Sequence, residues 1–307
     1  MKKFKNGIKG GNMKRILYWI VFLLFLSFLL YQMLDTEEYQ SKKKPIEDAP
    51  FQIYFIDVGQ GDCILIQSHG EYSLVDSGNY LDGEKLVSYF QELGIEKFQY
   101  VIGTHVHEDH IGGMNRILKS FKIGTYYMPN TPTEYNSYLS IMDTLPKRNI
   151  PYVVPKIGDI FYLNDTTLEV LSIGEDQENM NNTSIVLKVR YQDTTYLLMA
   201  DAEKEVELEL LNKDIQSDVL KVGHHGSNYA SSAQFLQKVK PKYAIISVGL
   251  ENEYGHPKKG TLDKLEYLNT EIHRTDIEGT IILSSDGKNI SIRTEKTDTN
   301  REEKKNY

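Results

Sequence analysis

The chain has 307 residues, of which 40% are hydrophobic, so it can bury a sizeable core in one large or two small domains. It carries 43 acidic against 35 basic residues, a formal net charge of −8. This balance is not the electrostatic footprint of a strong nucleic-acid binder, although it does not exclude a local patch that binds DNA. The single cysteine, Cys63, excludes an internal disulfide and lies in an apolar run typical of a core residue.

The N-terminal region joins a basic segment to an apolar run. Residues 1–15 hold six basic residues and no acidic one, which leaves the rest of the chain with 29 basic against 43 acidic residues, a net charge of −14. Residues 16–34 are uncharged, and a helix of about 20 residues spans a bilayer core. The pattern predicts a single transmembrane anchor that contacts membrane lipid, with the basic N-terminus cytoplasmic and the remaining chain extracellular. A cleaved signal peptide is the alternative, although no small-residue cleavage site follows.

The remaining chain is expected to form a polar linker, one folded domain and a polar tail. These parts correspond to residues 35–50, 51–294 and 295–307.

Strand and helix patterns alternate within the predicted domain. Strands are expected at 51–57, 63–66, 72–75, 100–102, 161–163, 168–171, 184–189, 196–199, 218–222, 244–248, 280–283 and 290–293. The four strands between residues 161 and 199 predict an antiparallel series. Helices are expected at 85–93, 114–121, 203–211 and 233–239. Many strands with interspersed helices predict two packed sheets with helices outside.

The motif His105-Val106-His107-Glu108-Asp109-His110 lies between a predicted strand and a predicted helix. His105 and His107 are two residues apart and face the same side of an extended segment. Asp109 and His110 are expected on the turn into the helix. Imidazole and carboxylate groups are ligands for zinc, manganese and iron, so the motif predicts a metal centre. Two metals need more than four protein ligands, so further ligands are expected downstream.

Two later positions are suited to complete this centre. Asp201 ends an apolar strand, where it can serve as a metal ligand or as the N-cap of the next helix. His224 and His225 leave another strand between two glycines, which permit close approach to a metal. One of the two histidines is expected to bind metal, and the other to act as general acid or to hold a phosphate.

Several motifs together resemble the ComEC-like branch of the metallo-β-lactamase-fold hydrolases. The histidine motif resembles the metal signature of that superfamily. Residues 57–62, 181–184, 220–227 and 254–257 resemble the branch motifs DVGQGD, NNxS, LKVGHHGS and YGHP, and the resemblance covers residues 52–293. One departure is Ala200, where the family commonly has glycine before its bridging aspartate, a change expected to matter little.

The resemblance implies an α+β fold, the αββα sandwich of the metallo-β-lactamase type, and a centre with two divalent metal ions, zinc or manganese. The implied ligands are His105 and His107 at site one, Asp109 and His110 at site two, Asp201 as the bridge, and His225 as the last ligand because it directly precedes a glycine. Asp76 is expected to orient a ligand histidine, and Ser227 and His256 to support the site or contact substrate.

One expected ligand is missing from the sequence. The usual superfamily pattern places a further histidine between the first motif and the bridging aspartate, but no histidine occurs from residue 111 to 223. Site one is therefore expected to be completed by water, by Asn182 or by substrate. A poorer nitrogen set makes manganese plausible beside zinc.

The resemblance implies a membrane-anchored, extracellular phosphodiesterase or nuclease without the multi-helix channel of the branch, acting on DNA, as in DNA uptake, or on cell-wall phosphodiesters. Asp109 and Asp201 are expected to orient an attacking hydroxide, and His224 to protonate the leaving group. Two alternatives stay open. The chain could hydrolyse a lactam, lactone or thioester, or it could be a non-catalytic, metal-bound module that binds DNA or wall polymer.

Overall fold

The computed structural model describes residues 19–20, 22–24, 49–174 and 178–296. The chain forms two units, Met1–Glu47 and Asp48–Tyr307. The described residues of the first unit are helical. Most of the predicted anchor, linker and tail lies outside the described residues. Within the part that the structure describes, no helix combines the length and apolar character needed to cross a membrane.

The second unit contains an eight-stranded sheet in the order β15-β14-β1-β2-β3-β4-β5-β6. The strands from β15 to β3 pair antiparallel, and those from β3 to β6 pair parallel. The bounds are β1 (Phe51–Phe55), β2 (Ile64–Ser68), β3 (Glu71–Val75), β4 (Lys97–Ile102), β5 (Lys122–Tyr127), β6 (Tyr152–Val153), β14 (Ile281–Ser285) and β15 (Ile290–Thr294).

A seven-stranded sheet packs against the first, in the order β13-β12-β11-β10-β9-β8-β7. Strands β7 to β10 form the predicted antiparallel series, which is confirmed, and β10 to β13 pair parallel. The bounds are β7 (Ile160–Leu163), β8 (Thr166–Ser172), β9 (Val186–Tyr191), β10 (Thr194–Leu198), β11 (Val219–Lys221), β12 (Tyr243–Ile246) and β13 (Glu271–Arg274).

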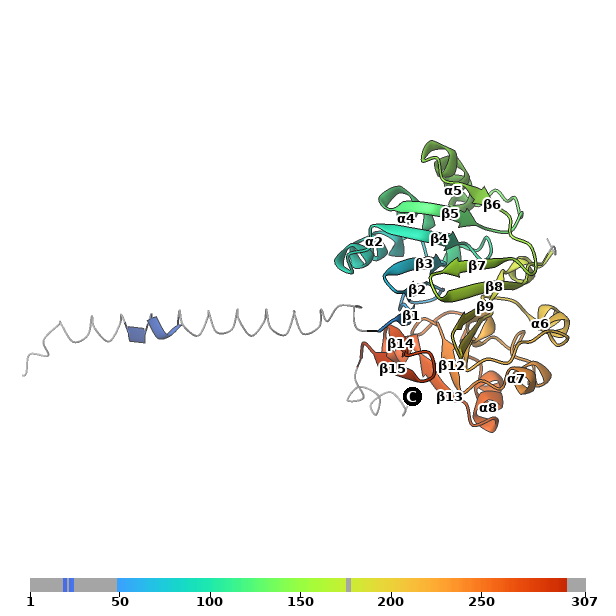
Figure 1. Ribbon diagram of the computed structural model, residues 1–307. Coiled ribbons are helices and arrows are strands. Elements are labelled where there is room, and N and C mark those ends of the chain that lie inside the picture. The colour runs from blue at the N-terminus through green and yellow to red at the C-terminus, as the bar shows by residue number, and fades with distance from the viewer. Residues whose placement is uncertain (1–18, 21, 25–48, 175–177, 297–307) are drawn as a thin grey trace, which may run out of the picture. The chain divides into compact units, whose positions relative to one another are not determined.

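Helices cover the outer faces of the two sheets, with α2, α4 and α5 on one side and α6, α7 and α8 on the other (Figure 1). The predicted αββα sandwich is therefore confirmed. The α-helices are α2 (Asp82–Glu92), α3 (Glu108–Ile111), α4 (Met114–Ser120), α5 (Asn136–Lys147), α6 (Lys204–Leu210), α7 (Ala233–Val239), α8 (Lys259–Tyr267) and α9 (Thr275–Glu278). Two 3-10 turns, η2 (Met180–Thr183) and η3 (Gly223–Gly226), lie beside strand ends.

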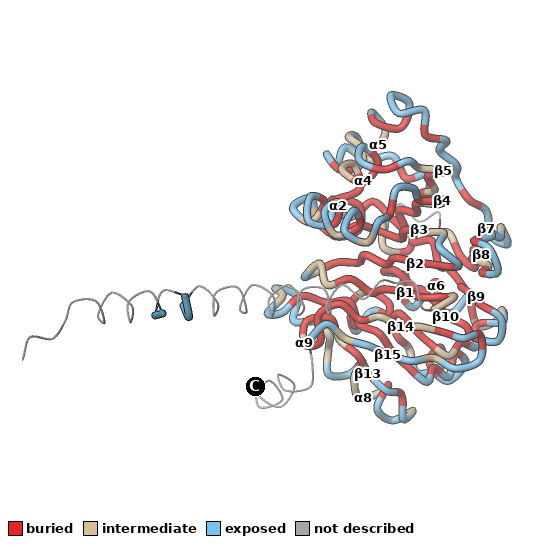
Figure 2. Tube along the Cα trace, turned by 60° about the vertical axis from the view of Figure 1, so that its left-hand side comes forward, coloured by how far each residue is buried: buried red, intermediate tan, exposed pale blue. Residues whose placement is uncertain are grey.

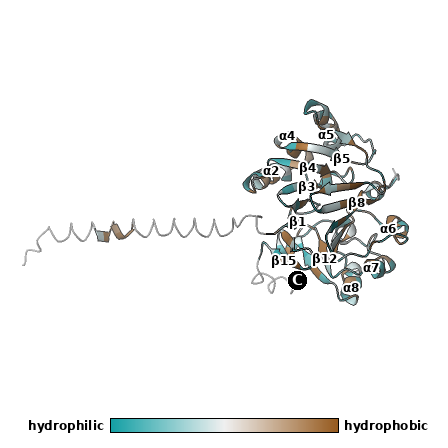
Figure 3. Ribbon diagram, in the orientation of Figure 1, coloured by the Kyte–Doolittle hydropathy of each residue, from teal (hydrophilic) through white to brown (hydrophobic). Residues whose placement is uncertain are grey.

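Two apolar clusters hold the layers together. Between the sheets, inward residues of β1 such as Phe51 and Ile53 meet residues of β9 and β10, and the Phe51 ring stacks on Tyr191 with centroids 5.1 Å apart. A second cluster joins the outer face of the seven-stranded sheet to α6, α7 and α8. Each fully buried large apolar side chain contributes roughly 1.5–3 kcal/mol. Figure 2 shows the buried colour following the strands, and Figure 3 shows the hydrophilic colour on α2.

Several elements were not predicted from the sequence, among them β5, α5, α8 and β13. Gly124 interrupts the strand pattern of β5, yet a side chain there would overlap the backbone of Gln99 on the neighbouring strand. Pro146 argues against a helix at α5, but it lies in the last turn, where few backbone hydrogen bonds are lost. In these places tertiary packing outweighs local preference.

Candidate metal centre

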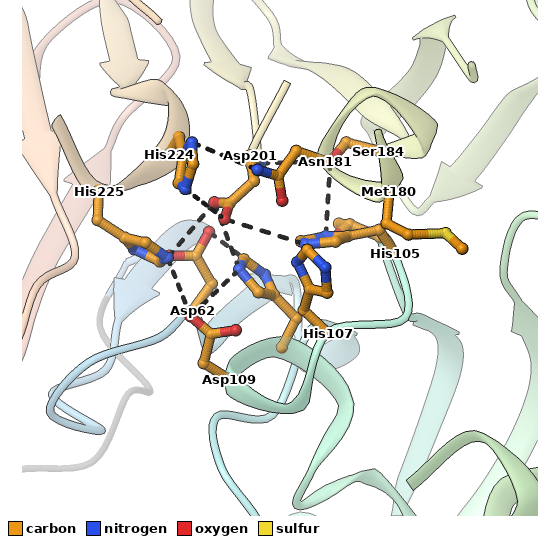
Figure 4. Close-up of polar contacts among 12 residues, drawn as sticks. Asp62, His105, His107, Asp109, Met180, Asn181, Ser184, Asp201, His224 and His225 are labelled. Atoms are coloured by element: carbon orange, nitrogen blue, oxygen red, sulfur yellow. Dashed lines mark hydrogen bonds and ion pairs between the residues drawn. The ribbon is translucent and has the colours of Figure 1, made fainter. Parts of the chain in front are cut away.

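The candidate centre forms where several strands end. Asp76 follows β3 and His105 follows β4, while Asp201 follows β10 and the two adjacent histidines follow β11. Because β3 and β4 are parallel, as are β10 and β11, the residues after these strands meet at one edge of each sheet. The two edges face each other, and the side chains converge as Figure 4 shows.

One group of possible ligands consists of Asp109, His110, Asp201 and His225, whose ligand atoms all lie within 4.8 Å of one another. His110 Nε2 is 3.3 Å and His225 Nε2 is 3.4 Å from Asp201 Oδ1. His225 Nε2 is also 3.3 Å from Asp109 Oδ2. Asp109 and His110 lie within the one-turn helix α3, rather than on a turn as expected.

A second group consists of His105, His107 and Asp201, again with ligand atoms within 4.8 Å of one another. His105 Nε2 is 3.0 Å from His107 Nδ1 and 3.9 Å from Asp201 Oδ2. Asp201 thus belongs to both groups and turns one carboxylate oxygen toward each. Its side chain caps no helix, since α6 begins after Glu203 and no side chain caps its N-terminus.

The buried polar atoms of this cluster fit a cation. His110 Nε2, His225 Nε2 and Asp201 Oδ1 are buried and have no hydrogen-bond partner among the described residues. Buried nitrogen and oxygen atoms without partners cost free energy unless something else satisfies them. Imidazole nitrogens and carboxylate oxygens that point at one another are the donor set of zinc and manganese, so the residues present fit divalent ions.

Further groups fix the rings of the first ligand group. Asp76 Oδ2 lies 2.8 Å from His110 Nδ1, and the same carboxylate accepts hydrogen bonds from the backbone and hydroxyl of Thr104. His225 Nδ1 lies 2.9 Å from the carbonyl oxygen of Ser247 and donates to it. With Nδ1 engaged, each ring presents Nε2 to the centre, which is the usual support of a metal-binding histidine.

The second group has weaker support. Among the described residues, His105 Nδ1 contacts two hydroxyls, at 3.2 Å from Thr104 Oγ1 and 3.5 Å from Ser184 Oγ. Its members are two histidines and one shared carboxylate, against two histidines and two carboxylates in the first group. The two groups therefore offer unequal sites, the second with fewer protein ligands.

His224 stands at the edge of the second group. Its Nδ1 lies 3.0 Å from Glu203 Oε1, and its Nε2 lies 3.7 Å from Asp201 Oδ2. Glu203 is itself held by the side-chain amides of Asn179 and Asn181, at 2.9 and 3.1 Å. The carboxylate of Glu203 keeps a proton on Nδ1, so the other nitrogen faces the cleft.

Electrostatics favour positive charge in the first group. Burial alone would lower the pKa of His225, but Asp201 and Asp109 raise it to about 10. Burial also lowers the pKa of His110, but the negative charges of Asp201, Asp109 and Asp76 together raise it well above its usual value. By contrast, burial and the charge of His110 hold the pKa of His105 well below its usual range. Protons that the first group holds are the ones that a metal would displace.

Two predicted residues lie outside the cleft. Asn182 turns away, because its amide oxygen accepts from the Glu203 backbone at 3.0 Å and its amide nitrogen contacts Glu205 at 3.3 Å. The amide that lines the cleft is Asn181, since the 3-10 turn η2 rotates the two asparagines apart. Ser227 is buried and accepts from the backbone of Tyr229.

His256 does line the cleft. Its ring stacks on that of Tyr254 with centroids 5.7 Å apart. Burial, followed by the charge of His224, lowers the pKa of His256 to about 4, so the ring is neutral at pH 7.

Three residues that support the centre were not predicted from the sequence. Asp62 and Lys221 form a fully buried ion pair of 2.7 Å beneath the centre, and Asp62 Oδ1 lies 3.5 Å from His225 Nδ1. A lysine inside the apolar strand β11 was a usable signal, because a buried charge needs a partner. Glu203 offered no such signal, since an acidic residue at a helix start is common.

Comparison with known proteins places the chain in a family. Residues 56–249 match the family model of the metallo-beta-lactamase superfamily. ComE operon protein 3 of Bacillus subtilis (strain 168) is 32% identical over 258 residues, which cover 77% of this chain and 33% of that protein. Competence protein ComA of Neisseria gonorrhoeae is 25% identical over 248 residues, which cover 79% of this chain and 33% of that protein.

The chain therefore spans about a third of the length of these relatives. Among solved structures, the metallo-beta-lactamase fold protein YhfI from Bacillus subtilis superposes with a TM-score of 0.52 at 11% identity, covering 79% of this chain and 100% of that one. This likeness shows the shared fold. With the family match and the ligand cluster, it follows that the chain belongs to the metallo-beta-lactamase superfamily of metal-dependent hydrolases, in its ComEC-like competence branch.

Proposed function

We propose that this chain hydrolyses phosphodiester bonds at a centre that holds two divalent ions, zinc or manganese. The observation that carries the proposal is the position of Asp201 between the two ligand groups. Its Oδ1 faces His110 and His225, and its Oδ2 faces His105. One carboxylate shared by two ligand sets is the arrangement of paired metal sites.

The protein groups around this position have separable roles. Bound divalent ions would lower the pKa of water toward neutrality and polarise a phosphoryl oxygen. The carboxylates of Asp109 and Asp201 accept hydrogen bonds from the attacking water and orient it. Glu203 fixes the ring of His224 at Nδ1, so Nε2 faces the cleft. In the doubly protonated form of this ring, Nε2 gives its proton to the departing oxygen and the ring becomes neutral.

One observation supports a phosphodiester over a lactam, lactone or thioester. The chain belongs to a branch whose members are named for competence and recombination, so DNA is the first polymer to test. The His224–Glu203 pair is placed to protonate the alkoxide that DNA hydrolysis releases.

The proposal is tested with the full chain, after elemental analysis and metal restoration. We expect turnover of bis(p-nitrophenyl) phosphate and of single-stranded DNA, and none of a β-lactam, a lactone or a thioester. His107→Ala should abolish turnover, whereas His69→Ala, at an exposed histidine paired with Asp165, should leave it unchanged. Hydrolysis of a non-phosphate substrate alone, or full activity in metal-loaded His107→Ala, would refute the proposal.

The role of His224 has its own test. His224→Gln should slow hydrolysis of a diester with an alkoxide leaving group by about 10²–10⁴-fold. It should barely affect a nitrophenolate, which departs without a proton. Glu203→Gln should also slow the alkoxide diester more than the nitrophenolate diester, but by a smaller factor than His224→Gln. Equal losses on both substrates would assign His224 another role.

We also propose that residues 16–34 anchor the domain on the outer face of the cell membrane. Support comes from the apolar run and its basic flank. Protease added to intact cells that express the full chain should digest the domain. Protection of the domain in intact cells, with digestion after lysis, would contradict this location.

A further inference from the structure

The ligand cluster opens into one large cleft of about 1170 Å³. None of the described residues that line this cleft is a lysine or an arginine. Its charged walls are acidic instead, with Glu108 and Glu134 beside the ligand carboxylates. Proteins that hold several phosphates of a polymer do so with basic side chains, so this cleft is not built to grip a phosphate backbone.

Three tyrosine rings line the same cleft: Tyr80, Tyr135 and Tyr254. Their exposed fractions are 55%, 48% and 54%, so large apolar ring surfaces face open solvent beside the centre. Aromatic rings exposed in a concave surface are typical of binding sites. They can stack on flat groups of a substrate without regard to charge.

Two of the rings are held in place. The guanidinium of Arg116 lies 4.1 Å from the ring centroid of Tyr80, and Glu84 pairs with Arg116 at 3.2 Å. The ring of Tyr254 stacks on His256 with an interplanar angle of 25°. A ring that is already fixed loses little conformational freedom when a substrate stacks on it, which favours binding.

The remaining walls are neutral hydrogen-bonding groups. They come from amides and hydroxyls, namely Gln60, Asn115, Asn136, Ser137, Ser140 and Asn181. Such groups can pair with the polar edges of a flat, uncharged ring, and they add no positive charge.

We infer that the cleft recognises a phosphodiester by the flat, uncharged ring systems that flank the phosphate, with Tyr80, Tyr135 and Tyr254 as the specificity-determining residues. The inference rests on the proposed function and deepens it, because it selects a ring-bearing diester such as a short oligonucleotide over a ring-free polyol-phosphate polymer. The phosphate itself would be bound at the ligand cluster.

The test compares wild type with Tyr135→Ala, Tyr254→Ala and the double variant, as full chains with metal restored. We expect each single change to lower kcat/KM for bis(p-nitrophenyl) phosphate by about tenfold, and Tyr254→Phe to retain activity. Tyr267→Ala is the matched control, since that ring is exposed on α8, away from the cleft. Glycerophosphoglycerol, which has no ring, should be a poor substrate that none of the tyrosine changes affects.

Salt dependence gives a second readout. For a labelled thymidine octanucleotide, log Kd against log salt concentration should have a slope of magnitude about 1 or less. A groove that contacts four phosphates through cations would give about 3. A steep slope, full activity of the double tyrosine variant, or preference for the ring-free diester would overturn the inference. Ring-dependent binding without turnover of any diester would instead refute the proposed function and leave this inference standing.

Discussion

The buried ion pair of Asp62 and Lys221 predicts a large loss of stability when the lysine is replaced. Both side chains are at most 1% exposed, and their charged atoms are 2.7 Å apart. Lys221→Met would leave the carboxylate of Asp62 buried without its cation, which costs about 3–5 kcal/mol. Two histidines lie farther from this carboxylate, with His225 Nδ1 at 3.5 Å and His110 Nδ1 at 4.0 Å. They replace the lysine only in part, because these nitrogens already donate to Ser247 and Asp76.

The matched control is Lys188→Met on the adjacent part of the same sheet. Lys188 is also buried and pairs with Asp214 at 2.9 Å, but Asp214 is 77% exposed and can return to water. Its loss should therefore cost about 1 kcal/mol or less. For a domain of this size, the two variants should melt roughly 10 °C and about 3 °C below wild type.

Thermal unfolding followed by circular dichroism, in EDTA to remove the effect of metal, measures both variants. The double variant Asp62→Asn with Lys221→Met should recover at least half of the loss, because no buried charge is left unpaired. If Lys221→Met melts no lower than Lys188→Met, the buried pair does not stabilise the site and this reasoning is wrong.

Three further predictions concern other parts of the site. Gly61→Ala should displace α3, because a Cβ at this position would overlap the carbonyl oxygen of Asp109, and elemental analysis should show a loss of metal. The control Gly59→Ala has open space around it, so it should lower the free energy of unfolding by only about 1 kcal/mol and keep the metal. Ala200→Gly should raise the free energy of unfolding by about 0.5–1 kcal/mol in a denaturant titration, because Ala200 has φ of +47°. The pKa of His225 is about 10 in the folded domain and near 6.5 in the unfolded chain. In EDTA, this difference stabilises the fold fully at a pH below about 6.5, and the stabilisation is lost as the pH rises toward 10. At pH 7.5, metal binding should accordingly release protons, measured by calorimetry in two buffers of different ionisation enthalpy; no release would contradict the raised pKa.

The sequence predicted the sandwich and a convergent ligand set because both follow from local patterns. Period-two apolar runs mark strands, and ligand-type residues follow these strands directly. The pattern did not predict which asparagine lies at the site. Asn182 was expected there, yet Asn181 lines the cleft, because η2 is a 3-10 turn in which side chains do not alternate as in a strand. The Asp62–Lys221 pair joins the loop between β1 and β2 of one sheet to β11 of the other, so only the assembled fold brings the two residues together.

The departure at Ala200 was expected to matter little, and the backbone gives it a physical cost. Ala200 adopts the left-handed conformation that glycine takes readily, as does Asp76 with φ of +60°. Such positions cost about 1 kcal/mol or more each for residues with a Cβ. Each lies within two residues of a strand end, where the buried strand fixes the chain on one side and the ligand contacts fix it on the other.

The same backbone feature separates the two adjacent histidines, which the sequence left open. His224 and His225 both have left-handed conformations, with φ of +47° and +50°. In an extended strand two successive side chains would point to opposite faces, so only one could reach the centre. Here the tight turn lets both reach Asp201, His225 at Oδ1 and His224 at Oδ2. The turn thereby places His225 beside Asp109 and His110. It leaves His224 paired with Glu203 and its second nitrogen toward the cleft, the position that the proposed proton donor needs.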